Sequence, residues 1–163
     1  MSDNKSIVED SSDREMVISR VVDAPRELVW KVWTEPEHVA KWWGPNGFST
    51  TIEVMDVRPG GEWKHTMRGP DGTNYPNHSK FIEVVKPERI VMEHGGHREG
   101  GTSVGFVATW TFEVVGPNQT KVTIRGLFPS AEERDRVIRE FGALEGGKQC
   151  LANLAEYVAT MTS

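Results

Sequence analysis

The 163 residues include 37% hydrophobic and 26% charged side chains, a balance that indicates one globular domain with its own core. The formal net charge of −5 argues against a nucleic-acid partner, because phosphate binding needs clustered positive charge. The single cysteine excludes a disulfide within the chain and is typical of a reducing compartment.

The N-terminal segment, residues 1–14, is polar and is expected to be a flexible tail, followed by a single domain over residues 15–163. It has neither the basic nor the apolar region of a secretory signal. No stretch of the chain approaches the roughly 18 apolar residues of a membrane-spanning helix. We therefore expect a cytoplasmic protein without a membrane span.

The first predicted elements are a strand and two short helices. Residues 16–22 are rich in β-branched side chains, which favour a strand. Pro25 suits the first turn of a helix, and apolar residues follow it at helical spacing. A second helix is expected to begin near residues 34–37, which have the spacing of a capping box, and to end at Gly44 and Pro45.

The middle of the chain is predicted to form six further strands, because polar and apolar side chains alternate there and turn residues separate the segments. Consecutive strands joined by short turns favour an antiparallel meander. Glycines between residues 95 and 101 predict a mobile hairpin loop, a candidate gate. The predicted strands cover residues 50–57, 62–68, 80–85, 89–94, 103–115 and 120–128.

The C-terminal part is predicted to be helical. Ser130 can cap a helix that starts at Ala131, and a final amphipathic helix is expected over residues 145–160. The apolar face of the sheet needs a cover, and this last helix can supply it. The fold class is therefore α+β: a helix-grip fold in which a curved antiparallel sheet of about seven strands, in β-α-α-β6-α order, surrounds a long C-terminal helix.

Five short strings of the sequence carry a resemblance to a known family. They are VWKVWTEPEH (29–38), KWWGP (41–45), GF (47–48), VRPGGEW (57–63) and MRGPDG (67–72). Over residues 16–162 the chain resembles the activator of heat-shock protein 90 ATPase homologue-like family, in the START-like, birch-pollen-allergen-like SRPBCC superfamily. The resemblance implies a seven-stranded sheet that grips a C-terminal helix around a deep cavity. This fold hosts binders, cyclases, hydrolases and chaperone partners, so it does not fix the function.

Aromatic, methionine and histidine side chains on the predicted strands and helices are the candidate ligand-binding residues. Any one of the tryptophans can instead fill the core, but together with the resemblance they favour an apolar pocket. His65 and His94 would orient a ligand there, and Glu53, expected to share a face with Met55, is the first carboxylate to consider as a base. The predicted lining is Trp42, Trp43, Phe48, Glu53, Met55, Trp63, His65, Met67, Phe81, Met92, His94, Phe106, Trp110 and Leu151.

No pattern of the sequence predicts a cofactor, a metal ion or a catalytic residue. His94 and His97 are three residues apart but lack a third ligand nearby in the sequence. There is no nucleophile elbow and no Ser-His-Asp arrangement. Cys150 lies in the final helical pattern, where a small buried thiol is expected.

Three functions remain open at this stage. The first is binding of a small hydrophobic ligand in the cavity, as a carrier, sensor or sequestering protein. The second is a chaperone or stress-response interaction module that docks onto a heat-shock chaperone. The third is a cyclase- or hydrolase-like enzyme that uses the pocket. We favour the first, a binder rather than an enzyme, with a small apolar molecule as its partner and no nucleic acid. A homodimer is also open.

Overall fold

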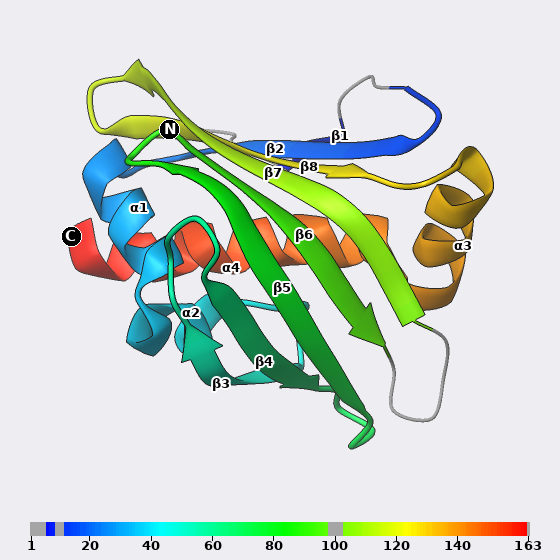
Figure 1. Ribbon diagram of the computed structural model, residues 1–163. Helices are drawn as coiled ribbons and strands as arrows, with labels where there is room; N and C mark the ends of the chain where they lie inside the picture. Colours follow the sequence, from blue (N-terminus) through cyan, green and yellow to red (C-terminus); the bar gives the residue numbers. More distant parts are fainter. Residues whose placement is uncertain (1–5, 9–11, 98–102, 163) are drawn as a thin grey trace.

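The computed structural model describes residues 6–8, 12–97 and 103–162 of the chain. Strands and helices follow one another in the expected order, including the helix capped by Ser130, and one short strand, β1, precedes them (Figure 1). The elements are β1 (Ile7–Val8), β2 (Glu15–Val22), α1 (Arg26–Thr34), α2 (Pro36–Trp42), β3 (Ser49–Met55), β4 (Glu62–Arg68), β5 (Asn74–Val85), β6 (Arg89–His97), β7 (Ser103–Gly116), β8 (Gln119–Leu127), α3 (Ala131–Phe141) and α4 (Ala143–Thr162).

The strands form one antiparallel sheet in the order β1-β2-β8-β7-β6-β5-β4-β3. Strands β3 to β8 are a meander, and β2 joins it by pairing with the last strand, β8. The seven longer strands confirm the predicted fold class. The short strand β1 pairs with β2 and lies within the segment expected to be a tail.

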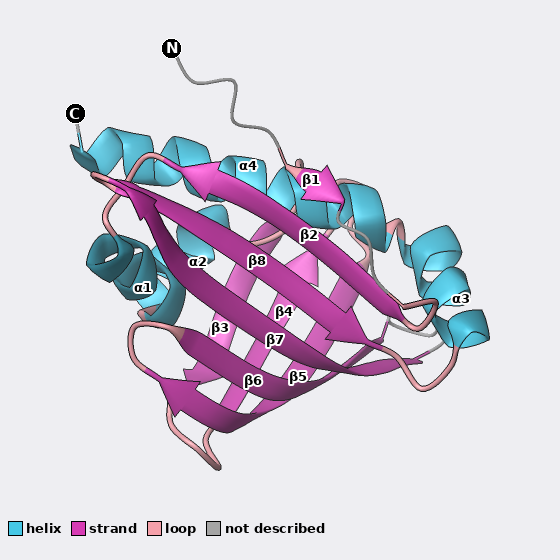
Figure 2. Cartoon of the chain, turned by 90° about the horizontal axis from the view of Figure 1, so that it is seen from above, coloured by secondary structure: helices cyan, strands magenta, loops and turns pink. Residues whose placement is uncertain are grey.

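The sheet curls, and α4 lies along its open, concave side. Seen from above, β3 and β4 lie beneath β7 and β8, while α4 runs beside β2 (Figure 2). The helix turns its apolar stripe towards the sheet, and Leu151, Leu154 and Val158 are fully buried there. Burial of this stripe, rather than helix propensity alone, holds α4 in place.

An aromatic cluster fills the part of the core between α1, α2 and the sheet. Trp33 lies at its centre, with ring centroids 5.1 Å from Trp110 and 5.2 Å from Phe112. Trp42 packs on the same ring at 4.9 Å and donates a hydrogen bond from Nε1 to the Val32 carbonyl. Edge-to-face pairs of this kind contribute about 0.5–1.5 kcal/mol each beyond area burial, so the cluster fixes the two short helices on the sheet.

The predicted helix starts are confirmed in part. Ser130 caps α3, because its Oγ accepts a hydrogen bond from the Glu133 N–H at 3.1 Å. The helix α2 begins where expected, but Thr34 does not cap it; its hydroxyl instead donates to the Trp30 carbonyl within α1. Glu35 is the N-cap residue of α2, and Pro36 occupies the first turn.

Strand β5 begins six residues earlier than predicted, at Asn74 instead of residue 80, and passes through Pro76. A proline interrupts the interior of a sheet but is tolerated where one side of the strand is unpaired. Pro76 pairs with Thr66 of β4, while the pairing with β6 extends only to Asn77. Of the glycines expected to form a gate, Gly95 and Gly96 belong to β6, and Gly100 and Gly101 lie outside the described residues.

Candidate functional site

A cavity of about 290 Å³ lies between the concave face of the sheet and the first half of α4. Its walls come from β2, β4, β5, β6, β7 and β8, the loop after α2, and helices α3 and α4. Exposed residues, including Arg125 and Glu140, border it near the end of α3, where it meets solvent. It brings together these predicted ligand-binding residues: Trp43, Phe48, His65, Met67, Met92, His94, Phe106 and Trp110.

Strand alternation explains why these side chains face the cavity. On β7, Ala108 and Trp110 are buried and share a face with Phe106. On the neighbouring strand β6, Met92 pairs with Ala108 and His94 pairs with Phe106. Met92 and His94 therefore lie on the same face of the sheet as these β7 residues. The lining is therefore mainly apolar, and its large side chains are aromatic rings and methionines, the composition typical of a pocket for small apolar molecules.

Four further predicted residues belong to the packed core rather than to the cavity wall. Trp42, Trp63, Phe81 and Leu151 are 3% exposed or less and do not line the cavity. Trp42 and Trp43 separate because α2 ends between them: Trp43 has extended backbone angles, φ −65° and ψ 135°, and turns towards the cavity.

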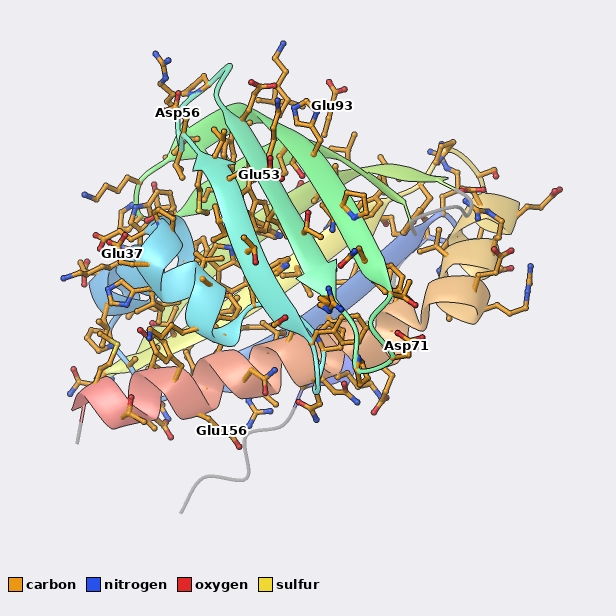
Figure 3. All side chains as sticks on the ribbon, turned by 90° about the horizontal axis from the view of Figure 1, so that it is seen from below. Glu37, Glu53, Asp56, Asp71, Glu93 and Glu156 are labelled. Atoms are coloured by element: carbon orange, nitrogen blue, oxygen red, sulfur yellow. The ribbon has the colours of Figure 1, made fainter. Side chains whose placement is uncertain are left out.

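Glu53 and Met55 lie on different faces of β3, contrary to the expected alternation. A β-bulge between Ile52 and Val54 shifts the register, so that Met55 pairs with the buried Trp63. Glu53, labelled in Figure 3, is exposed. Met55 is half-buried, and neither residue borders the cavity.

Several residues that line the cavity are absent from the lining predicted from the sequence. Gly146 and Gly147 of α4 face the cavity, and a Cβ on Gly147 would lie 2.6 Å from Ile18 Cδ1. A pair of glycines inside a helical pattern is the signal that indicates such a close approach. Tyr75 and Asn77 also line the cavity, on the part of β5 that the prediction omitted.

The cavity has one histidine without any hydrogen-bond partner. The His65 side chain is 1% exposed, and neither its Nδ1 nor its Nε2 is paired. Its ring stacks on Trp63 with centroids 4.0 Å apart. Desolvation by burial, with a smaller contribution from nearby His94, lowers the pKa of His65 to about 3. The imidazole is therefore neutral at physiological pH.

A second histidine lies close to the first, two strands away across β5. His94 Nδ1 is 2.8 Å from Ser79 Oγ, and desolvation lowers the pKa of His94 to about 4. Between them, on β5, Asn77 pairs with His65 and donates from Nδ2 to the Tyr75 carbonyl at 2.7 Å. One wall of the apolar cavity thus carries a strip of uncharged polar side chains.

Cys150 also faces the cavity but is not activated. Burial raises the pKa of its thiol to about 12, and the Gly44 N–H lies 3.4 Å from Sγ. A protonated thiol is a poor nucleophile, so Cys150 acts as a small packing group, as expected.

Within the described ranges, no group of three or more His, Cys, Asp or Glu side chains could hold a metal ion. The side chain of His97, the possible partner of His94, lies outside the described part. None of the described helices is long and apolar enough to cross a membrane.

Solved structures of bacterial proteins share this architecture. A protein from Arthrobacter aurescens is 26% identical, with a TM-score of 0.85 over 94% of this chain and 91% of its own. Protein Ms6760 from Mycobacterium smegmatis is 25% identical, with a TM-score of 0.82 over 98% of both chains. Protein NE0264 from Nitrosomonas europaea is 24% identical, with a TM-score of 0.80 over 93% of this chain and 98% of its own, and shows the shared fold.

A comparison with curated proteins gives no match. The family described as "Activator of Hsp90 ATPase homolog 1-like protein" matches residues 23–159. This span covers most of the chain and includes α1, α2 and strands β3 to β8, five of which line the cavity. The protein therefore belongs to the Activator of Hsp90 ATPase homolog 1-like family and is a helix-grip domain of that family.

Proposed function

We propose that the protein binds a small hydrophobic ligand in the cavity between the sheet and α4, as a carrier, sensor or sequestering protein. The observation that supports this is a cavity of about 290 Å³ whose wall is mainly apolar and rich in aromatic and methionine side chains, inside an otherwise packed core. Protein interiors are close-packed, so a void of this size is destabilising unless something fills it.

The size of the cavity suggests the size of the ligand. An engineered apolar cavity of about 150 Å³ holds benzene, so a cavity of about 290 Å³ suits a molecule of two fused or linked rings. Removing about 200 Å² of apolar ligand surface from water contributes about 5 kcal/mol. The loss of free motion on binding offsets part of this gain.

The chemistry of the pocket favours binding over catalysis. A general base works best when its pKa is near the operating pH, whereas the pKa values of His65 and His94 are lowered to about 3 and about 4. The thiol of Cys150 is protonated. Docking onto a heat-shock chaperone and formation of a homodimer stay predictions from the family resemblance.

Tryptophan fluorescence tests the proposal directly, because Trp43 and Trp110 line the cavity. We expect the neutral dye 1-naphthylamine, which has two fused rings, to quench tryptophan emission saturably and to gain emission itself, since energy transfer needs close approach.

The matched variants are Ala108→Phe and Thr109→Phe. Ala108 faces the cavity, so a phenylalanine there fills it; Thr109, the next residue along β7, points to the opposite face. Dye uptake should be lost in Ala108→Phe and kept in Thr109→Phe. The proposal fails if the wild type takes up no dye, or if Ala108→Phe takes it up as well as the wild type does.

A further inference from the structure

The cavity holds a polar group that the protein alone leaves unsatisfied. His65 borders the cavity, and its side chain is only 1% exposed. Both of its ring nitrogens are buried without a hydrogen-bond partner. A buried polar group without a hydrogen bond is destabilising by about 1–3 kcal/mol. Unpaired groups that persist in a folded protein call for an explanation, and a ligand that pairs with them is one.

Neighbouring side chains extend this polar spot on the same wall. His94 is held through Nδ1 by Ser79, which leaves its other ring nitrogen to pair with a ligand. Asn77 uses its amide nitrogen on the Tyr75 carbonyl, which leaves its side-chain oxygen as an acceptor. The strand pairs His65–Asn77 and Ser79–His94 place these groups on three adjacent strands.

We propose that the ligand is a small aromatic molecule carrying one uncharged hydroxyl group, which hydrogen-bonds to His65 and its polar neighbours. This inference rests on the proposed function and names the ligand class of that same cavity. A neutral imidazole presents one donor and one acceptor. A hydroxyl also donates once and accepts, so it satisfies this wall, whereas an ether or a carbonyl only accepts.

A carboxylate fits this wall less well. His65 and His94 are neutral at physiological pH, since burial lowers both pKa values. The positive charge of Arg125, at the border of the cavity, is paired with Glu15 at 2.8 Å. Among the residues that the structure describes, the other charged one at that border is the acidic Glu140. A buried anion would therefore lose its hydration without gaining an opposite charge.

The rest of the wall favours an aromatic body for the ligand. Trp43, Trp110 and Phe106 contribute aromatic rings, and Met67 and Met92 contribute polarisable thioethers. Aromatic pairs and sulfur–aromatic contacts each stabilise a bound ring beyond simple area burial.

Three naphthalene probes of similar shape test the inference by calorimetric or NMR titration at pH 7.5. They are 2-naphthol, 2-methylnaphthalene and 2-naphthoate, which place a hydroxyl, a methyl or a carboxylate at one position. We expect 2-naphthol to bind about tenfold more tightly than 2-methylnaphthalene, and 2-naphthoate to bind most weakly. In the wild type, 2-naphthol should also shift the ring ¹⁵N resonances of His65.

The variants His65→Phe and His78→Gln locate the preference. His65→Phe keeps an aromatic ring against Trp63 but cannot hydrogen-bond, so the ratio of the two Kd values should fall to near one. His78 is exposed and bonded to Glu62 outside the cavity, so its variant should keep the wild-type ratio. If no probe binds, the proposed function itself fails. If 2-methylnaphthalene binds as tightly as 2-naphthol, or 2-naphthoate binds most tightly, ligand binding stands and the hydroxyl inference is overturned.

Discussion

Two imidazoles with lowered pKa values make the folded state sensitive to mild acid. A histidine in the unfolded chain takes up a proton near pH 6.5, whereas His65 and His94 do so in the folded protein only near pH 3 and pH 4. Between these values the unfolded state binds more protons, so stability rises with pH and is lost as pH falls. Hydrogen bonding to Arg125 lowers the pKa of Glu15 from 4.5. A carboxylate of this kind therefore changes the stability of the fold only at pH values below those at which the two histidines act.

We expect the free energy of unfolding to fall between pH 6.5 and pH 4.5 by about 1.4 kcal/mol per pH unit for each of the two histidines. His65→Phe should remove one of the two contributions and roughly halve the slope. Urea unfolding at a series of pH values measures this. Equal slopes for the wild type and His65→Phe would contradict the assignment, and His78→Gln, an exposed control, should leave the slope unchanged.

The turn between β3 and β4 contains two adjacent glycines, and a different physical constraint excludes a side chain at each of them. Gly60 has φ +86° and nothing near its Cβ position, so only its backbone conformation matters. A Cβ on Gly61 would lie 2.0 Å from the Asp56 carbonyl oxygen, which is backbone and cannot rotate away. Both residues also hydrogen-bond to the backbone of Phe81, which ties the turn to β5.

Replacing either glycine by alanine therefore tests two separate effects. Gly60→Ala should destabilise by about 1–2 kcal/mol, the cost of a positive φ, and Gly61→Ala by about 3 kcal/mol or more, because the turn must move. Chemical denaturation of both variants provides the comparison. A Gly61→Ala loss no larger than that of Gly60→Ala would show that the turn yields easily.

Single residues also show where sequence reasoning succeeds and where it stops. Alternation correctly placed His65 and Met67 on the inner face of β4, because the side-chain period of a strand is purely local. It failed at Glu53, since a bulge depends on how the partner strand pairs. Trp42 and Trp43 could not be told apart because the prediction extended α2 to Gly44, whereas the helix ends at Trp42.

At the level of whole elements, the junction of α3 and α4 is a single glycine that also borders the cavity. Gly142 ends α3 with φ +60° and ψ +35°, the left-handed conformation typical of a helix C-cap. A Cβ there would meet no atom within 4 Å. The Gly146 N–H donates to the Gly142 carbonyl at 2.8 Å, so α4 begins directly after this turn.

Gly142→Ala should destabilise the protein by about 1–2 kcal/mol, because alanine disfavours the left-handed conformation while no steric clash contributes. Asparagine tolerates that conformation better, so Gly142→Asn should lose about half as much or less. Thermal unfolding measures both, with about 2–4 °C per kcal/mol expected for a chain of this length. Equal losses for alanine and asparagine would mean that something other than the backbone angle limits this position.

The elements themselves were largely predictable, but their mutual placement was not. The six strands, both short helices and the amphipathic pattern of α4 follow from local periodicity and turn residues. The cavity also needs the distance between α4 and the sheet, which depends on the contact of Gly147 with Ile18, far apart in the chain. The glycine pair of α4 is a signal that the sequence offers, whereas the contribution of Val137 in α3 could not be found without that geometry.

At the scale of the whole molecule, the cavity is a consequence of how the sheet curls around α4. The aromatic cluster around Trp33 fills the part of the concave face next to α1 and α2. Helix α3 and the start of α4 enclose the opposite end of the sheet (Figure 1). The cavity lies where the first half of α4 carries Gly146, Gly147 and Cys150 instead of large side chains. Further along α4, the buried side chains of Leu151, Leu154 and Val158 fill the space between the helix and the sheet.

Because a ligand in this cavity binds only the folded protein, it should raise the unfolding temperature by mass action. At a free concentration of 100 times Kd the gain is about 2.7 kcal/mol, which corresponds to about 5–10 °C for a chain of this length. The shift should grow logarithmically with the concentration of 2-naphthol and be absent in Ala108→Phe, whose added ring occupies the space. Thr109→Phe should respond as the wild type does. A shift of the same size in Ala108→Phe would place the bound molecule outside the cavity, because filling the void cannot leave a site within it unchanged.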